Sequence, residues 1–183
     1  MELHLIRHPR PDVAPGICYG QSDVGLAESA ATVATRLRPL LPDAFALHAS
    51  PLARARLLAQ ELGTPVFDDR IKEMHFGAWE LQPFAGIGAA MDAWAADPLG
   101  FRAPGGESAR DMARRALHWL DERLAAPAPP ALVVVAHGGP LRAIAGHLLG
   151  LPAERWLGLD FACGHVTRID VETWGNTLKW FNR

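Results

Sequence analysis

Hydrophobic residues follow two alternating patterns along this chain: short apolar runs, and longer stretches with apolar positions three or four residues apart. Short runs are typical of buried strands, whereas the longer spacing is typical of helices with one buried face. The short runs predict strands at residues 3–6, 46–49, 65–67 and 132–136. The helical spacing predicts helices at residues 26–38, 51–62 and 85–96, after Ser108, and at residues 140–149.

Two further runs near the carboxyl end, residues 165–171 and 177–181, predict a hairpin of strands with its turn at Gly175-Asn176. The strands and helices before it alternate in the order typical of parallel strands joined by helical crossovers. We therefore expect an α/β fold: a three-layer α/β/α sandwich with a mostly parallel central sheet and an antiparallel edge strand. The length of 183 residues suits a single domain, residues 1–183.

Capping signals mark the starts of two helices. Ser50 followed by Pro51 predicts a helix with Ser50 as its N-cap and Pro51 in the first helical position. Ser108 and Asp111 have the spacing of a capping box at the start of the long helix. The inner face of that helix is expected to contain Ala116, Leu117, Leu120 and Leu124.

Three segments lack a regular pattern. Residues 9–25, rich in proline and glycine, are too long for a simple connection, and such loops usually have a function. Residues 68–84 are expected to lie across the top of the sheet. Residues 127–130, with the sequence Pro-Ala-Pro-Pro, form a linker before the most apolar strand.

Composition excludes several kinds of ligand and partner. The net charge of −2 gives none of the basic surplus that nucleic-acid binding usually requires. Cys18 and Cys163 are far apart, have no zinc-ligand spacing, and are expected to be buried reduced thiols. Met1-Glu2 leads directly into the first strand, so we expect no signal peptide, and no apolar run approaches the roughly 18 residues of a membrane span. We expect a cytoplasmic protein with no nucleic-acid or membrane partner.

The ends of the predicted strands carry residues that suggest chemistry. Arg7 and His8 follow the first strand, His137-Gly138 follows the central strand, and Arg54 lies near the start of the helix after the second strand. Because ligands in such folds bind at the carboxyl ends of the strands, we expect these groups to converge. Guanidinium groups and a helix amino terminus suit a phosphate dianion. The arginines would also favour the neutral, nucleophilic form of His8.

Phosphoryl transfer also needs a proton donor for the leaving oxygen. Glu73 is the best candidate, because it lies in the irregular segment expected to cover the pocket, and His75 and Glu80 are next in line. Plainer interpretations remain open from local sequence alone. They are a solvated turn for the Arg7-His8 pair and a solvated loop carboxylate for Glu73.

Four segments occur in a characteristic order and span nearly the whole chain: Leu5-Ile6-Arg7-His8, Ser50-Pro51-Leu52-Ala53-Arg54-Ala55, the stretch from Glu73 through Phe76-Gly77 to Trp79-Glu80, and Val135-Ala136-His137-Gly138-Gly139. Together they resemble the histidine phosphatase superfamily, in its phosphoglycerate mutase-like branch. The resemblance implies that His8 is the phosphorylated nucleophile and Glu73 the general acid. It also implies that His137 takes part in catalysis and that the phosphate pocket comprises Arg7, His8, Arg54, His137 and Gly138.

The loop 16–26, Gly-Ile-Cys-Tyr-Gly-Gln-Ser-Asp-Val-Gly-Leu, is similar to that of the α-ribazole phosphatases of cobalamin synthesis. This similarity implies that Tyr19, Gly20 and Gln21 border the leaving group; the alternative for Tyr19 is an ordinary packing anchor. Pro9 departs from the family pattern, which usually has glycine or threonine after the histidine. Proline lacks an N–H, so any phosphate contact made by that group is lost. Arg10 is a candidate replacement charge.

These features predict a metal-independent phosphomonoesterase that forms a phosphohistidine intermediate and needs no cofactor. Its partner is expected to be a small-molecule phosphate ester, with the nucleotide-like α-ribazole 5′-phosphate favoured. The alternatives are a phosphoglycerate mutase-type phosphotransferase and a non-catalytic phosphate-binding interaction module. We expect a monomer or a homodimer. The remaining singled-out residues are expected to pack or lie at interfaces without forming a metal site: His4, His48, His118, His147, Trp156, Trp174 and Trp180.

Overall fold

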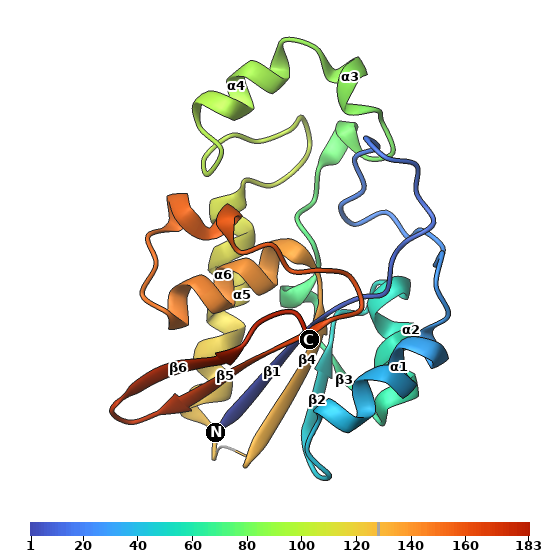
Figure 1. Cartoon of the computed structure of the whole chain (residues 1–183). Coiled ribbons are helices and arrows are strands. Elements are labelled where there is room, and N and C mark those ends of the chain that lie inside the picture. Colours follow the sequence, from blue (N-terminus) through green and yellow to red (C-terminus); the bar gives the residue numbers. More distant parts are fainter. Residues whose placement is uncertain (128) are drawn as a thin grey trace.

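The computed structural model describes residues 1–127 and 129–183; Ala128, in the predicted linker 127–130, lies outside the described residues. Within these described residues, six strands form one sheet in the order β3-β2-β4-β1-β5-β6 (Figure 1). The strands are β1 Glu2–Arg7, β2 Ala46–Ala49, β3 Val66–Phe67, β4 Ala131–Ala136, β5 Val166–Glu172 and β6 Gly175–Trp180. The first four are mutually parallel, whereas β5 runs antiparallel to β1 and to β6. The predicted mostly parallel sheet with an antiparallel edge is confirmed.

Helices cover both faces of this sheet (Figure 1). They are α1 Ala30–Leu37, α2 Ala53–Leu62, α3 Phe84–Ile87, α4 Ala90–Ala96, α5 Ala109–Ala125 and α6 Gly138–Leu148. Successive residues of a strand face opposite sides. Leu5 and Val134 therefore join the core beneath α5 and α6, whereas Ile6 and Val133 join the core beneath α1 and α2. Two apolar cores on either side of one sheet make the expected three-layer sandwich.

The helix predicted from residue 26 begins later, at Ala30. The preceding residues pair with the start of the same long loop. The Ala27 N–H donates to the Arg10 carbonyl oxygen over 2.9 Å, and Leu26 forms an isolated bridge with Pro11. This pairing across the loop overrides the helical spacing of the sequence.

The prediction that Ser50 caps α2 is wrong, because the helix begins at Ala53. Asp23, from the long loop, accepts a hydrogen bond from the Ala53 N–H over 2.7 Å. A side chain distant in sequence therefore accepts the hydrogen bond of an N–H group at the helix start. The capping box of Ser108 and Asp111 is confirmed.

Three other local predictions need correction. The helix predicted at 85–96 is split into α3 and α4 at Gly88, which has a φ of +66°. Leu124 is 37% exposed, because the buried face of α5 ends at Leu120. The hairpin turn is Thr173-Trp174 rather than Gly175-Asn176, since the Asn176 amide donates to the Leu148 carbonyl oxygen and residue 176 pairs within the sheet.

His4 and His48 lie in strands with buried side chains, as expected. Within residues 1–127 and 129–183, no helix combines the length and apolar character needed to cross a membrane.

Candidate active site

The carboxyl ends of β1, β2 and β4 share one edge of the sheet. His8 follows β1 and His137 follows β4; because these strands are parallel neighbours, the two imidazole rings meet, with centroids 5.1 Å apart. Arg54 reaches His8 from the first turn of α2, and Gly138 begins α6 directly after His137. The structure thus brings together the groups that the sequence predicts to converge.

His8 is buried, and both of its ring nitrogens have a partner. Nδ1 lies 2.7 Å from the carbonyl oxygen of Pro9, which can only accept, so Nδ1 carries the proton. Nε2 therefore has the lone pair, and the Arg54 Nε–H donates to it over 3.3 Å. Burial, together with the positive charges of Arg54 and Arg7, lowers the pKa of His8 from its usual 6.5 to about 3. The imidazole is therefore neutral near pH 7.

The departure from the family pattern at Pro9 leaves this arrangement intact. Residue 9 contributes its carbonyl oxygen to His8, and proline retains that group. Arg10, the candidate replacement charge, has an exposed side chain, and its carbonyl oxygen holds Ala27 across the loop.

Arg54 is completely buried beneath the loop that follows β1. Besides its contact with His8, its guanidinium donates to the carbonyl oxygens of Ser22 (3.0 Å) and Gly20 (2.5 Å). The guanidinium carbon lies 5.3 Å from the ring centre of Tyr19, within the range of a cation–π contact. The loop therefore holds Arg54 against His8.

Two buried nitrogen atoms near His8 lack a hydrogen-bond partner among residues 1–127 and 129–183: Nε of Arg7 and Nδ1 of His137. Arg7 is anchored by Nη1, which donates to the Phe161 carbonyl oxygen over 2.6 Å. Burial and the charge of Arg54 hold the pKa of His137 well below its ordinary value. Buried polar groups are rarely left unpaired. An anion in this position would accept hydrogen bonds from both nitrogens.

Ser50 belongs to this site. Its hydroxyl lies 2.8 Å from Nε2 of His137 and accepts a hydrogen bond from the Leu52 N–H over 3.3 Å. A hydroxyl that donates to Nε2 leaves the proton of His137 on Nδ1, the nitrogen without a partner. The sequence signal for this role is the position of Ser50 directly after β2, at the same sheet edge as the two histidines.

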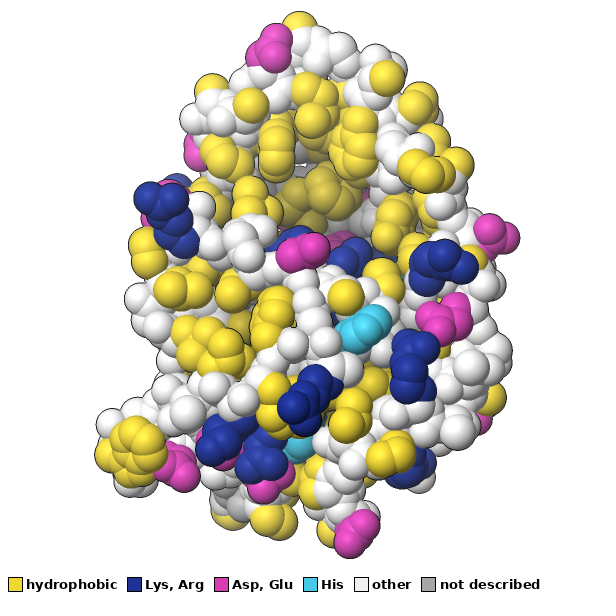
Figure 2. All heavy atoms as spheres, viewed as in Figure 1, with side chains coloured by type: hydrophobic (Ala, Val, Ile, Leu, Met, Phe, Trp, Pro, Cys, Tyr) yellow, Lys and Arg dark blue, Asp and Glu magenta, His cyan; other side chains and the backbone are white. Residues whose placement is uncertain are grey.

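A cavity of about 720 Å³ opens at this edge of the sheet. Arg7 and His8 line it, whereas Arg54 and His137 are fully buried next to His8 and are not among its described lining residues. Figure 2 shows the hollow, with hydrophobic side chains above it and charged side chains along its lower edge. Aromatic residues contribute much of the wall: Tyr19, Phe76, Trp79, Phe84, Trp94 and Trp156.

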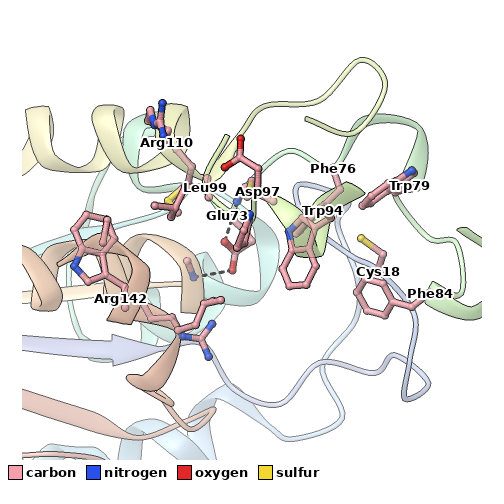
Figure 3. Close-up of a pocket in the computed structure, with 18 of the residues that line it drawn as sticks. Cys18, Glu73, Phe76, Trp79, Phe84, Trp94, Asp97, Leu99, Arg110 and Arg142 are labelled. Atoms are coloured by element: carbon pink, nitrogen blue, oxygen red, sulfur yellow. Dashed lines mark hydrogen bonds between the residues drawn. The ribbon is translucent and has the colours of Figure 1, made fainter. Parts of the chain in front are cut away.

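Glu73 lies in the same cavity, between α6 and Trp94 (Figure 3). Its carboxylate accepts hydrogen bonds from the N–H groups of Gly139 (3.2 Å) and Met74 (2.9 Å). A Cβ atom at position 139 would overlap the carboxylate, so this glycine lets Glu73 approach the start of α6. The structure therefore brings Glu73 into the cavity that His8 lines.

The backbone of Glu73 is held from two sides. The guanidinium of Arg115, on α5, donates to three carbonyl oxygens of the segment 70–73, over 2.7 to 2.8 Å, and forms an ion pair with Glu107. From the other side, the Gln21 amide donates to the Glu73 carbonyl oxygen over 3.0 Å. Sequence patterning does not identify Arg115, because its role depends on a segment more than forty residues away.

Of the three residues expected to border the leaving group, Tyr19 lines the described part of the cavity, whereas Gly20 and Gln21 build the loop. The N–H groups of Gly20, Gln21 and Ser22 donate to the carboxylate of Glu80 over 2.8 to 2.9 Å. Burial opposes ionisation of Glu80, but hydrogen bonds from the Ser22 hydroxyl and from backbone N–H groups, including those of Gln21 and Ser22, lower its pKa. Glu80 is thus held as an ionised anchor, which is unsuited to donating a proton.

Arg142 is a second cation beside Arg7 that the sequence prediction lacks. It lines the cavity from α6, and its Nε donates to the Leu159 carbonyl oxygen over 2.9 Å. Burial and the nearby charge of Arg7 lower the pKa of Arg142. Its position one helical turn after Gly138 is the sequence signal that could have identified it.

Comparisons with known proteins agree with this arrangement. The model of the histidine phosphatase superfamily (branch 1) matches residues 3–183. The chain belongs to this superfamily.

Relatives of this chain include differently named enzymes. A glucosyl-3-phosphoglycerate phosphatase of Mycolicibacterium vanbaalenii is 33% identical over 174 residues, covering 84% of this chain and 76% of the relative. A probable phosphoglycerate mutase of Erwinia tasmaniensis is 28% identical over 183 residues, covering 93% and 85%. The crystal structure of the α-ribazole phosphatase from Shigella flexneri has a TM-score of 0.91 and 25% identity, covering 100% of this chain and 96% of that chain. These relatives support an enzyme of the phosphatase or phosphotransferase type.

Proposed function

We propose that the protein is a metal-independent phosphomonoesterase that forms a phosphohistidine intermediate on His8, with residues 1–183 acting as one catalytic domain. The observation that carries the proposal is the state of His8. Its imidazole is neutral and has its lone pair on Nε2. The ring lines the cavity and lies near Arg7 and Arg54. A neutral imidazole next to two guanidinium groups combines a nucleophile with an anion site. The arginines supply positive charge for the phosphoryl oxygens.

In the first step, the Nε2 lone pair of His8 forms a bond to phosphorus while the bond between phosphorus and the ester oxygen breaks. Arg54 Nε turns from the His8 lone pair to a phosphoryl oxygen, and Arg7 Nε and His137 Nδ1 donate to the others. Glu73 gives a proton to the leaving oxygen, and the alcohol departs into the aromatic part of the cavity.

In the second step, a water molecule attacks the phosphorus of phosphohistidine. The Glu73 carboxylate takes a proton from this water as the bond between phosphorus and Nε2 breaks, and the electron pair returns to His8. Inorganic phosphate leaves, and Glu73 is again protonated. One carboxyl group therefore serves as acid and then as base.

As substrate we propose α-ribazole 5′-phosphate or a related cobalamin precursor. The support is the loop 16–26, together with the overall similarity to the Shigella flexneri α-ribazole phosphatase. The alternative is a mutase-type phosphotransferase, favoured by the phosphoglycerate mutase-named relatives. Such an enzyme would use the same residues but pass the phosphoryl group to an alcohol. A non-catalytic phosphate-binding module would make no covalent intermediate.

The decisive experiment traps the intermediate. Brief incubation with a radiolabelled phosphate ester, followed by a denaturing quench, should leave acid-labile, base-stable label on His8. His8→Ala should lose the label and lower kcat/KM by roughly 10³-fold or more, because a missing nucleophile disables the whole group. His118→Ala is the matched control, since this histidine is exposed on α5. Label on another residue would reassign the nucleophile.

Two further measurements separate the alternatives. Excess chelator should leave hydrolysis of p-nitrophenyl phosphate unchanged; loss that a divalent cation restores would overturn the metal-independent mechanism. With α-ribazole 5′-phosphate, released inorganic phosphate should match substrate consumed. Transfer of the label to added glycerate instead would identify a phosphotransferase, and a chain that neither labels nor turns over any ester would be a binding module.

A further inference from the structure

The outer part of the cavity is predominantly aromatic. Phe84 and Trp94 line it from the segment of α3 and α4, and Trp156 and Leu157 line it from the 3-10 helix η4, Ala153–Gly158. Figure 3 shows Phe84 and Trp94 on the side of the cavity away from α6, with Glu73 between them and Arg142. The aromatic part therefore begins where the leaving oxygen would be released.

These side chains are incompletely buried by the protein itself. Phe84 is 39% exposed and Leu157 is 57% exposed, in contrast to the fully buried core tryptophan Trp119. The Trp156 indole N–H already donates to the Leu151 carbonyl oxygen over 3.0 Å, so this residue offers the cavity an apolar surface. Exposed apolar surface that lines a concave site is typical of a ligand pocket.

Charged groups on the described part of the outer wall are poorly suited to an anionic leaving group. Arg142 lies beside Arg7 at the phosphate end, and its Nη2 is 3.6 Å from Asp160. Arg110 also lines the cavity, together with two carboxylates, Asp97 and Glu154. A carboxylate on the leaving group would therefore face two like charges and one cation. An uncharged group avoids that repulsion.

We infer that the outer part of the cavity is a subsite for an uncharged, planar aromatic leaving group, carried on the alcohol of the phosphate ester and packed against Trp94 and Trp156. The inference rests on the proposed phosphatase function. Aromatic rings prefer offset or edge-to-face contacts with other rings, which favours a planar ring system over a flexible chain of similar size. The size of the cavity suits such a group together with the phosphate.

A panel of phosphate esters of primary alcohols tests the subsite. The members are 2-(2-naphthyl)ethyl phosphate (aromatic), n-octyl phosphate (aliphatic), 3-phosphoglycerate (anionic) and ethyl phosphate (small reference). We expect kcat/KM for the naphthyl ester to exceed that for ethyl phosphate and for 3-phosphoglycerate by roughly tenfold or more, the scale of selectivity that apolar pockets reach. Equal or better turnover of 3-phosphoglycerate would overturn the inference, and octyl phosphate matching the naphthyl ester would overturn the preference for aromatic groups.

Variants of Trp94 test whether the aromatic wall of the cavity causes the preference among esters. Trp94→Ala should lower kcat/KM for the naphthyl ester by roughly tenfold more than kcat/KM for ethyl phosphate, through a rise in KM, since the lost contact concerns binding of the leaving group. Trp94→Phe, which keeps a ring, should retain most of the preference. Trp174→Ala is the matched control, because Trp174 is 76% exposed at the β5–β6 turn. Equal losses on all esters in Trp94→Ala would contradict a subsite role.

The phosphohistidine label distinguishes the two possible failures. A chain that forms the label on His8 but shows no ester preference would contradict the subsite and leave the proposed phosphatase function standing. A chain that forms no label and hydrolyses none of the four esters would contradict the proposed function itself.

Discussion

The two ends of the cavity are built differently. At the inner end, His8, Arg54 and His137 are buried at strand ends and helix starts, and the contacts of each come from several elements. At the outer end, half-exposed aromatic side chains lie on the short helices α3 and α4 and on η4. The residues of the inner end are therefore part of the folded core. The aromatic residues of the outer end lie on short helices outside that core.

Under the proposed function, this difference separates the residues that carry out the reaction from the residues that select the leaving group. Groups that exchange charge and protons need fixed positions, which buried contacts from several directions supply. The outer wall needs only shape and apolar surface, and its short helices α3 and α4 pack on a separate small core around Cys18, Trp79 and Ala103.

Glu73 lies where the two ends meet, and its replacement should give the largest effect. Glu73→Gln should lower the rate on an alkyl phosphate by about 10²-fold to 10⁴-fold, the usual contribution of general acid catalysis. The loss should be much smaller on p-nitrophenyl phosphate, because nitrophenolate leaves without needing a proton. Steady-state kinetics on both esters measure the ratio.

Glu154→Gln, another carboxylate of the cavity wall, is the control for that measurement. It should change neither rate substantially. Equal losses on both esters in Glu73→Gln would mean that Glu73 only holds the pocket together. The proton donor would then have to be sought at His75, because the Glu80 carboxylate is already occupied by hydrogen bonds.

Arg115 should act on catalysis from outside the cavity, through the position of Glu73. Arg115→Lys exchanges a forked guanidinium group for a single ammonium group. The guanidinium reaches three carbonyl oxygens, so the segment 70–73 should shift when it is lost. A displacement of this kind should cost roughly tenfold to a hundredfold in kcat on an alkyl phosphate, with a smaller loss on p-nitrophenyl phosphate.

The adjacent Arg114, whose side chain is exposed on α5, provides the matched control as Arg114→Lys. Unchanged leaving-group dependence in Arg115→Lys, despite a general loss of rate, would indicate a purely structural role.

The smallest expected effect is on stability, and it concerns the inner end alone. The pKa of His8 is about 3 in the folded protein and near 6.5 when unfolded, so the unfolded chain binds more protons between these values. The free energy of unfolding contributed by neutral His8 is fully present above pH 6.5 and is lost as the pH falls toward about 3. His137, whose pKa is also lowered, acts in the same direction.

Urea denaturation midpoints should therefore fall steadily between about pH 7 and about pH 4.5. His8→Gln should flatten this dependence, whereas His118→Gln, at an exposed position, should not. An identical slope in the His8→Gln variant would show that other groups cause the acid sensitivity.

Much of the inner end could be predicted from the chain because its signals are local. Apolar runs at 3–6 and 132–136 mark strands, and the residues directly after them, His8 and His137, meet because parallel neighbours end at the same edge. The capping box of Ser108 and Asp111 is equally local, since both partners lie within one helical turn. Periodicity and position therefore sufficed for the sheet, its layers and the convergence of Arg7, His8, Arg54 and His137.

Tertiary structure alone decided which hydrogen-bond partners the polar residues near this sheet edge have. Ser50 contacts His137 instead of capping α2, Gln21 holds the backbone of Glu73, and Arg115 supports a segment far away in sequence. The physical reason is that a hydrogen bond between distant segments leaves no trace in hydrophobic spacing, because it depends on where the folded chain brings each donor and acceptor together. Local sequence determined which residues reach the sheet edge, and long-range contacts decided what each of them does there.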